Sequence, residues 1–429
     1  MRAMSLRCSV IAVVLGALAG ASGARANPLD MYGFGPRGAS LAGAVGADVA
    51  DTSAVYYNPA GLGRLRGLRV DLGYQYAAPT LRTDRRDNGV EATRGILGGI
   101  AAPGRVFGLP MAIGIAFHIP DAGLSQSPSP AASQPRWALY GARLQRVYVA
   151  TALTIAPVRW LRLAAGFALT VGTAGGVAAE GRVSTTHPAT SALSHTLDAD
   201  LTAARYAQLG AQADLGRGVS LGVTYRDAFV MEVGVDASLR GQLVEGPAED
   251  PRSPATPFAY ALRARTLTAF QPRQVAMSAA WQINPRWRAG IDLTWSQWSG
   301  YEDPSAPRAA LRLNDTLTPR FGLSYDAPLG RHAVALRAGY FWDPTPVPAQ
   351  TDATSLIDSN RHGFSVGVGA VLRRLGAALP GSLSVDAFAA LHLLRPRATR
   401  KLDPTDPVGD FIASGHVLAT GVNLSVGFE

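Results

Sequence analysis

The sequence has almost no cysteine and almost no lysine. Cys8 is the only cysteine among the 429 residues, so the rest of the chain offers neither a disulfide framework nor thiol chemistry. Lys401 is the only lysine, and the arginines are scattered along the chain and do not cluster on one element. Nucleic-acid binding needs basic residues gathered on one face, so we expect no nucleic-acid partner.

Long hydrophobic runs are missing after the N-terminal region, which excludes a transmembrane helix there. Within that region, the basic residues Arg2 and Arg7 precede an apolar run from Cys8 to Ala21, and the small-residue cleavage site Ala24-Arg25-Ala26 follows it. This pattern predicts a cleaved signal peptide at residues 1–26. An exported chain that is 47% hydrophobic and contains 47 glycines is either a large soluble β protein or an outer-membrane barrel.

Catalytic and metal-binding patterns are weak. The stretch from Gly33 to Gly38 fits a nucleotide-binding glycine pattern, but no strand precedes it. Ser220 and Ser365 both match G-x-S-x-G, yet each lies within strand-like alternation instead of the strand-to-helix turn of a nucleophile elbow. The seven histidines show no metal-ligand spacing. We therefore predict no catalytic residue, no metal and no cofactor; a barrel enzyme that hydrolyses lipid through one of these serines is a remaining alternative.

Apolar and polar residues alternate with period 2 in many segments, beginning at Leu68, Val70 and Leu72. We treat 218–240 as one long strand, because its apolar odd positions continue through Arg226-Asp227. The pattern predicts fourteen strands, at 67–78, 95–103, 110–119, 144–157, 159–172, 205–214, 218–240, 273–283, 287–298, 317–326, 332–343, 362–373, 381–395 and 414–428.

The connections between these strands are alternately long and short, as in bacterial barrels with long outer loops and short periplasmic turns. The even strand number also suits a closed barrel. The sequence therefore predicts an all-β fold, a fourteen-stranded antiparallel transmembrane β-barrel over residues 67–429, in the bacterial outer membrane. The aromatic Phe428 near the end of the last strand suits recognition by the barrel-insertion machinery.

Residues 27–66 do not alternate and are rich in small side chains, notably in "ASLAGAVGADVAD". A barrel of fourteen strands is too wide for its own side chains to fill. We therefore predict that 27–66 forms a hatch that plugs the lumen, with a disordered periplasmic tail as the alternative.

Several motifs, in order, resemble those of one family. "YYNPAGL" is similar to the sequence that closes the hatch in FadL/TodX outer-membrane transporters, and "VTYRDAF" and "LRAGYFWDPTPVPAQ" are similar to two of its strands. The resemblance implies a hatch-plugged fourteen-stranded barrel that imports long-chain fatty acids or aromatic hydrocarbons. It makes Asn58, Pro59, Ala60 and Gly61 the hatch motif, which either gates or only shapes a turn. It also implies lateral exit beside a kink in the third strand, for which Gly114 is the candidate.

Two arginines are candidates for binding a ligand carboxylate. Arg320 and Arg337 have inward parity on neighbouring strands, and a desolvated arginine–carboxylate pair can be bidentate. The alternative is a structural network in which they pair with acids such as Asp71, Asp292 or Asp386.

Apolar residues of the long outer links are candidates for ligand capture, with simple loop packing as the alternative; they are Trp137, Leu139, Tyr140, Phe258 and Tyr260. The sequence thus predicts passive uptake of a hydrophobic small molecule by a monomeric barrel surrounded by outer-membrane lipid and lipopolysaccharide. The long-chain fatty acid is the first expectation for the cargo. An aromatic-hydrocarbon channel and a general diffusion porin are the alternatives.

Overall fold

The structure is a computed structural model that describes residues 29–121, 137, 139–140, 146–301, 312–351, 356–373, 381–406 and 408–428. The predicted signal peptide lies outside the described residues. None of the helices among these residues has both the length and the apolar character needed to cross a membrane.

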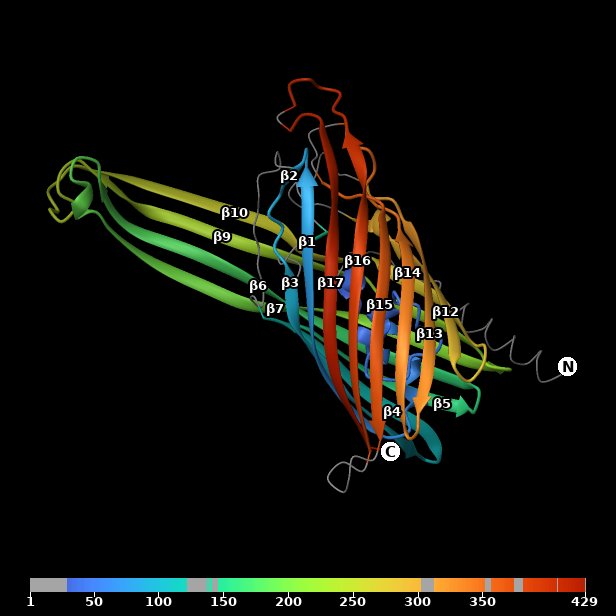
Figure 1. The fold of residues 1–429 in the computed structure, drawn as a ribbon. Coiled ribbons are helices and arrows are strands. Elements are labelled where there is room, and N and C mark those ends of the chain that lie inside the picture. Colours follow the sequence, from blue (N-terminus) through green and yellow to red (C-terminus); the bar gives the residue numbers. More distant parts are fainter. Residues whose placement is uncertain are drawn as a thin grey trace.

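Fourteen antiparallel strands close into a barrel, as predicted (Figure 1). The first wall strand, β1, pairs on one side with β3 and on the other with the last strand, β17, which closes the wall. The wall strands are β1 (Leu68–Thr83), β3 (Thr93–Val106), β4 (Leu109–Pro120), β5 (Tyr148–Val158), β6 (Leu161–Ser184), β7 (Ala192–Gly216), β8 (Val219–Arg226), β11 (Arg273–Gln282), β12 (Trp287–Gln297), β13 (Thr316–Leu329), β14 (His332–Asp343), β15 (Arg361–Arg373), β16 (Ser382–Thr399) and β17 (Phe411–Phe428).

The wall is apolar outside and polar inside, because successive side chains of a strand point to opposite faces. On β1, Leu72 is 56% exposed on the outer surface, whereas Asp71 and Gln75 are buried on the lumen side. The same pattern recurs around the wall, with exposed Ile100 on β3 and Phe167 on β6. An outward apolar band over a polar interior is the arrangement of a transmembrane barrel.

The predicted single strand 218–240 is wrong. The chain breaks after Arg226, and β9 (Phe229–Val244) begins a separate element outside the wall ladder. Asp227 Oδ1 accepts hydrogen bonds from the Tyr225 hydroxyl (3.0 Å) and the Ala228 amide (2.9 Å), which turns the chain. Apolar alternation continues through this turn because β9 also has an apolar face, so parity alone did not reveal the break. The wall still has fourteen strands, because β8 is the only part of 218–240 that pairs within the wall, between β7 and β11.

Four strands form a sheet that projects from the barrel, here called the arm (Figure 1). β6 and β7 extend far beyond their predicted ends at 172 and 205, with the 3₁₀ turn η3 (Pro188–Thr190) between them. β9 pairs in parallel with the extension of β6, and β10 (Ala255–Gln271), which was not predicted as a strand, pairs with β9. The order in the arm is therefore β7-β6-β9-β10. Two further short elements are β2 (Arg86–Asp87) and the 3₁₀ turn η4 (Trp298–Gly300).

The N-terminal residues 29–66, here called the inner segment, lie inside the barrel (Figure 1). They form short turns: α2 (Leu29–Tyr32), α3 (Pro36–Ser40), α4 (Ala54–Tyr57) and the 3₁₀ helix η1 (Pro59–Arg64). Val55, Tyr56 and Leu62 of this segment share one buried apolar cluster with the small wall residues Ala116 and Ala152. Small side chains on both sides let the segment approach the wall closely, which positions the residues described next.

Candidate functional site

Asn58 fastens the inner segment to the wall. Its side chain is fully buried, and Nδ2 donates to Gly46 O (2.8 Å) and to the wall carbonyl of Ala211 (3.0 Å). Its Oδ1 accepts from the Ala60 amide (3.1 Å), which caps η1. Pro59 follows as the first residue of η1, where its missing N–H costs nothing. Asn58 thus shapes the turn and also joins the inner segment to β7.

Several backbone carbonyls of the inner segment accept hydrogen bonds from polar side chains of the wall. Buried carbonyls need such partners, since an unpaired one costs free energy comparable to a lost hydrogen bond. The donors come from β5, β7 and β8: Thr154 to Pro59 O (2.7 Å), Gln208 to Val55 O (2.8 Å), Gln212 to Gly46 O (3.0 Å), Thr224 to Tyr57 O (3.0 Å) and Arg226 to Tyr56 O (3.0 Å).

Two glycines permit the close approach of this turn. A Cβ on Gly210 of β7 would lie 2.3 Å from Asn58 Oδ1, and one on Gly61 would lie 2.4 Å from Val49 O. Both distances are shorter than side-chain atoms tolerate, so each position requires glycine for contact and not for its backbone angles.

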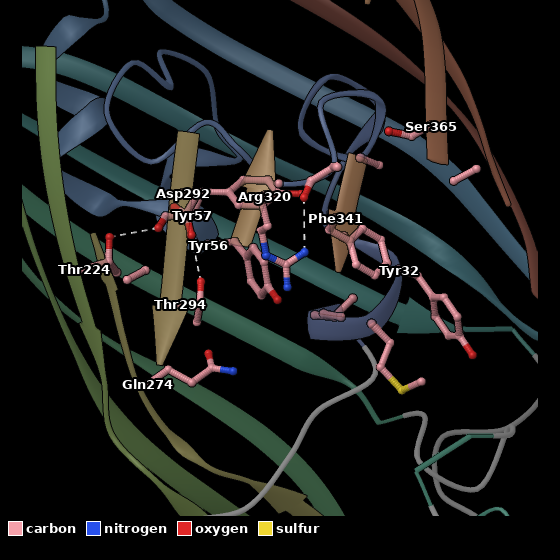
Figure 2. Close-up of a pocket in the computed structure, with 18 of the residues that line it drawn as sticks. Tyr32, Tyr56, Tyr57, Thr224, Gln274, Asp292, Thr294, Arg320, Phe341 and Ser365 are labelled. Carbon is pink, nitrogen blue, oxygen red and sulfur yellow. Dashed lines mark hydrogen bonds between the residues drawn. The ribbon is translucent and has the colours of Figure 1, made fainter. Parts of the chain in front are cut away.

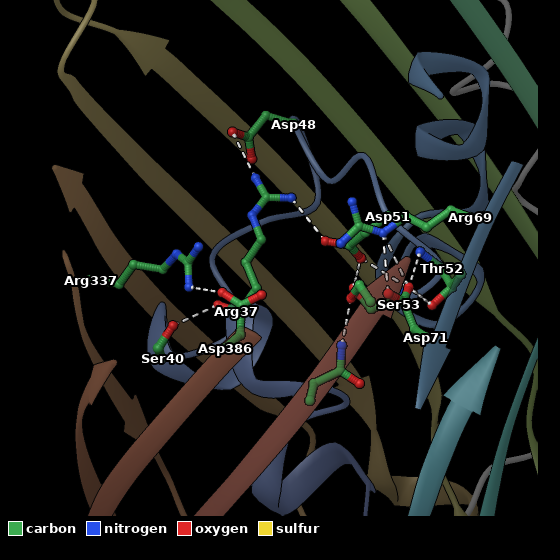
Figure 3. A network of polar contacts seen from close by, with 12 residues as sticks. Arg37, Ser40, Asp48, Asp51, Thr52, Ser53, Arg69, Asp71, Arg337 and Asp386 are labelled. Atoms are coloured by element: carbon green, nitrogen blue, oxygen red, sulfur yellow. Dashed lines mark hydrogen bonds and ion pairs between the residues drawn. The ribbon is translucent and has the colours of Figure 1, made fainter. Parts of the chain in front are cut away.

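Ion pairs hold the inner segment at two further places. Arg64 Nη2 and Arg162 Nη1 both bind the Asp214 carboxylate, the latter at 2.9 Å. Arg288 Nη1 of β12 lies 3.0 Å from Asp48 Oδ2 of the inner segment. Arg37 stabilises the inner segment internally, with Nη1 3.1 Å from Asp51 Oδ2 and Nη2 3.8 Å from Asp48 Oδ2 (Figure 3). The segment is therefore held to the wall by charge as well as by hydrogen bonds.

A cavity of about 70 Å³ remains between the inner segment and the wall (Figure 2). Tyr32, Tyr56, Tyr57 and Phe341 provide aromatic surface, and Arg320 and Asp292 provide charge. A buried water needs at least about 10–15 Å³ of such volume, so the cavity has room for a few waters and is too small for a long acyl chain in this conformation.

Arg320, one of the two predicted carboxylate contacts, lines this cavity. Its Nη1 donates to Ala42 O (3.1 Å), and its guanidinium carbon lies 5.2 Å from the centre of the Phe341 ring. Among the described residues it forms no ion pair. This leaves a positive charge at the cavity wall with donors in addition to the one that Ala42 engages.

Arg337 is placed differently. Its Nη1 lies 2.6 Å from Asp386 Oδ1, and both side chains are about one-tenth exposed (Figure 3). This is the pairing of the structural alternative, and Arg337 does not line the cavity. The structure therefore separates the two arginines that parity had grouped together.

The predicted irregularity at Gly114 is wrong. The ladder of β4 continues without a register shift on both sides, opposite Ala101 of β3 and Ala152 of β5. Gly114 instead makes room for the inner segment, because a Cβ there would lie 2.9 Å from side-chain atoms of Leu62 and Val55.

The candidate capture residues fall into two groups. Trp137 and Tyr140 are buried: Trp137 Nε1 donates to Asn88 Oδ1 (3.1 Å), and the Tyr140 hydroxyl donates to Asp358 Oδ1 (3.1 Å). Leu139 packs on the same cluster, which also contains Tyr32 of the inner segment. These contacts are those of the loop-packing alternative.

Phe258 and Tyr260 were predicted to lie in an outer loop, but they lie on β10 of the arm. Tyr260 is 61% exposed there, and Phe258 is half-buried. The two side chains therefore lie on a sheet and not in a loop. The sequence did not predict this strand, because Ala, Thr and Pro interrupt the apolar alternation around the two residues.

The two serines of the G-x-S-x-G matches have structural partners. Ser220 Oγ donates to Asp214 (2.8 Å), and Ser365 Oγ donates to Ser40 O (2.9 Å). Within the described part of the chain, no group of three or more metal-ligating side chains occurs.

Sequence reasoning missed Arg226 and Gln274, which also line the cavity. Arg226 Nη1 donates to Gln274 Oε1 (2.9 Å), and its guanidinium carbon lies 4.3 Å from the Tyr56 ring centre. Both residues have even, inward parity on β8 and β11, so the same alternation that identified Arg320 could have found them.

One family of known proteins matches the chain. A family model described as outer membrane protein transport protein (OMPP1/FadL/TodX) matches residues 145–388, more than half of the chain. The chain belongs to this family. It is therefore an outer-membrane transporter of hydrophobic compounds of the FadL/TodX type, which confirms the resemblance found in the motifs. No curated protein sequence matches the chain.

Solved structures of FadL/TodX proteins share the fold. A FadL homologue of Pseudomonas aeruginosa is 15% identical with a TM-score of 0.61, covering 95% of this chain and 100% of its own. The monoaromatic hydrocarbon channel CymD is 14% identical with a TM-score of 0.54, covering 94% of this chain and 99% of its own. The toluene transporter TodX of Pseudomonas putida is 12% identical with a TM-score of 0.51, covering 94% of this chain and 100% of its own. At these identities the likeness supports the barrel fold alone.

Proposed function

We propose that this FadL/TodX-type barrel takes up long-chain fatty acids passively, and that Arg320 binds the carboxylate in the lumen. The observation that carries the proposal is the position of Arg320 at the cavity, with no ion-pair partner among the described residues. A carboxylate in a site shielded from water prefers a guanidinium partner, because charge-assisted hydrogen bonds are about twice as strong as neutral ones.

Uptake then proceeds in four steps: capture at the outer surface, binding in the lumen, movement of the inner segment, and lateral exit through the wall. Tyr260 and Phe258 on the arm are the capture surface, since Trp137 and Tyr140 are already packed. The cavity is too small for an acyl chain while the segment is docked, so movement of the segment must accompany binding. The β4 ladder is intact on both sides, so exit requires the wall to part.

A second candidate is uptake of one-ring aromatic hydrocarbons. The observation that favours it is the small cavity lined by Tyr32, Tyr56, Tyr57 and Phe341. A general diffusion porin is disfavoured, because the inner segment occupies the lumen that a porin keeps open.

Binding measurements with the purified protein separate the two cargoes. Arg320→Gln is expected to weaken binding of a long-chain fatty acid by roughly 10- to 100-fold, the value of one charged hydrogen-bonding contact. Binding of toluene, which carries no charge, should not change. Arg320→Lys keeps the charge and should retain part of the affinity. Equal fatty-acid affinity in the wild type and in Arg320→Gln would contradict the proposal, as would copurification of aromatic hydrocarbon and no fatty acid.

A further inference from the structure

Six wall residues lie in one row across neighbouring strands, on the lumen side. Residues that lie side by side in neighbouring strands share a face. The register gives the order Ser278 (β11), Asp292 (β12), Arg320 (β13), Phe341 (β14), Gly363 (β15) and His392 (β16). Four of the six line the cavity, and these are Asp292, Arg320, Phe341 and His392. The proposed carboxylate site and His392 therefore belong to one surface.

Gly363 brings the aromatic ring of Phe341 close to His392. A Cβ at Gly363 would overlap the Phe341 ring, so the absence of a side chain lets that ring lie across β15. The Phe341 and His392 ring centres are 5.0 Å apart, edge to face. The guanidinium carbon of Arg320 lies 5.2 Å from the centre of the same Phe341 ring. One aromatic ring therefore contacts both the guanidinium and the imidazole.

His392 has an unpaired nitrogen in the interior of the barrel. The residue is only 2% exposed, and its Nδ1 has no hydrogen-bond partner in the described part of the chain. The Tyr32 ring stacks on the imidazole at 5.9 Å, and the buried Tyr32 hydroxyl is also without a partner there. A buried polar atom that is left unpaired costs free energy. The docked inner segment thus covers two polar groups that it does not satisfy.

Binding of the cargo uncovers this imidazole. Tyr32 belongs to the inner segment, and the segment must move to admit an acyl chain (Figure 2). A neutral imidazole has one donor and one acceptor nitrogen, and a hydroxyl group can both donate and accept. A ligand hydroxyl can therefore pair with Nδ1 in either tautomer of His392. A carbonyl or carboxylate oxygen only accepts, so it fits one tautomer alone.

We infer that His392 binds a hydroxyl group of the cargo, and that the preferred ligand is a long-chain fatty acid hydroxylated near its carboxyl end. The inference rests on the proposed function, in which Arg320 binds the carboxylate. Arg320 and His392 contact one Phe341 ring, so the two polar groups of the ligand must be close together. A plain acyl chain at this place leaves Nδ1 unpaired, whereas the hydroxyl satisfies it.

The assignment of the carboxylate to Arg320 is consistent with the other cation of this region. The guanidinium carbon of Arg361 lies 5.3 Å from the centre of the Phe341 ring, but Arg361 forms an ion pair with Asp343. Arg320 forms no ion pair among the described residues and lines the cavity. The carboxylate therefore binds at Arg320, and the hydroxyl points toward β16.

Three acids of equal chain length test the position of the hydroxyl. The purified wild-type barrel should bind 3-hydroxyhexadecanoate about 10- to 100-fold more tightly than hexadecanoate, the effect of one buried hydrogen-bond partner. A hydroxyl at the far end of the chain cannot reach His392 while the carboxylate is on Arg320. Hence 16-hydroxyhexadecanoate should bind no more tightly than hexadecanoate. Equal affinity for the 3-hydroxy acid and hexadecanoate, or a preference for the 16-hydroxy acid, would overturn the inference.

His392→Phe tests the residue itself. It keeps an aromatic ring beside Tyr32 and Phe341 but removes both ring nitrogens, so it should abolish the preference for the 3-hydroxy acid without weakening hexadecanoate binding. His392→Asn offers an amide near the position of Nδ1 and should retain part of the preference. His362→Phe is the matched control, because His362 does not line the cavity and bonds to the Tyr340 hydroxyl (2.9 Å). Heat-modifiable migration verifies that each barrel is folded. A preference that survives in His392→Phe would exclude this assignment.

Arg320→Gln separates the inference from the proposed function. If Arg320 binds the carboxylate, this substitution weakens binding of hexadecanoate and of its 3-hydroxy derivative equally and leaves their ratio unchanged. If neither affinity changes in Arg320→Gln while His392→Phe still abolishes the preference, the carboxylate contact is wrong and the hydroxyl contact stands. If the wild-type barrel binds neither acid, both are wrong.

Discussion

Arg320 and Asp292 lie directly opposite each other on β13 and β12, yet they do not form an ion pair within the described structure. Asp292 instead accepts hydrogen bonds from Ser278 (2.5 Å) and Thr294 (2.7 Å), and Arg320 donates to Ala42 O (Figure 2). Each charge is held by neutral partners, so the arginine is kept near an acid without being neutralised by direct contact.

This relationship predicts a gain of affinity from removing an acid. Asp292→Asn deletes the negative charge that faces the same cavity, so a fatty-acid anion at Arg320 no longer experiences its repulsion. Binding should tighten by about tenfold, the size of a screened interaction of about one kcal/mol or slightly more. Isothermal titration with a long-chain fatty acid measures it, and toluene binding is the control. Weaker fatty-acid binding in this variant would argue against a carboxylate in the cavity.

The Arg337–Asp386 pair predicts a loss of stability, not of selectivity. Arg337→Ala leaves Asp386 charged and buried without its partner, which costs about 3–5 kcal/mol in buried pairs. The variant barrel should unfold at a lower temperature in detergent, as shown by heat-modifiable migration. Arg252→Ala, in an exposed pair with Asp250, is the control and should have little effect. If Arg337→Ala kept full heat resistance, the pair would not be structural.

Asn58→Ala tests whether the inner segment is held by this side chain. The substitution removes the donor to Gly46 O and Ala211 O and the cap of η1, at about 1 kcal/mol for each hydrogen bond. We expect more leakage of small hydrophilic solutes through liposomes that contain an intact, heat-resistant barrel. Asn314→Ala changes an exposed asparagine and should not leak. Misassembled barrels would show that Asn58 only shapes the turn.

Gly210→Ala approaches the same contact from the wall. The new Cβ would meet Asn58 Oδ1 at 2.3 Å and the Pro59 ring at 2.8 Å, so the turn must move. We expect the same solute leakage as in Asn58→Ala. Gly104→Ala on β3, where a Cβ meets nothing within 4 Å, is the matched control. Normal tightness in Gly210→Ala would mean that the segment shifts without loosening.

The packing of Tyr140 and Leu139 beside Asp358 should respond to pH. Burial raises the pKa of its carboxyl from 3.8 to about 6, although Thr345 and Arg361 oppose the shift. The packed arrangement with Tyr140 is therefore most stable below the ordinary pKa and loses on the order of 3 kcal/mol as the pH rises through 6. Maleimide labelling of Leu139→Cys should accelerate between pH 5 and 7.5 beyond that of exposed Thr196→Cys. Asp358→Asn should abolish the excess, and an excess that persists would assign it elsewhere.

The sequence predicted the wall well because lipid outside and water inside impose strict alternation, as at Leu72 and Asp71. Parity also placed Arg320 and Arg337 in the lumen, but it could not separate them, because pairing with Asp386 depends on a strand distant in sequence. The arm was missed for a related reason. Its apolar face has the same period as the wall, so alternation through Asp227 looked like one strand, and the parallel pairing of β6 with β9 leaves no local signal.

The hydrogen bonds from Thr154, Gln208, Gln212 and Thr224 reach carbonyl groups of the inner segment and not its side chains. Every residue type provides the same carbonyl. At these four places the barrel therefore binds the backbone of the inner segment, and the contact does not depend on which residue provides the carbonyl. Substitution of the four polar wall side chains should therefore loosen the inner segment whichever residues fill it. Within residues 39–49 the residue type still matters at Gly43, which has a φ of +83°, at Gly46, where a Cβ would lie 2.3 Å from Ser278 Oγ, and at Asp48, which pairs with Arg288.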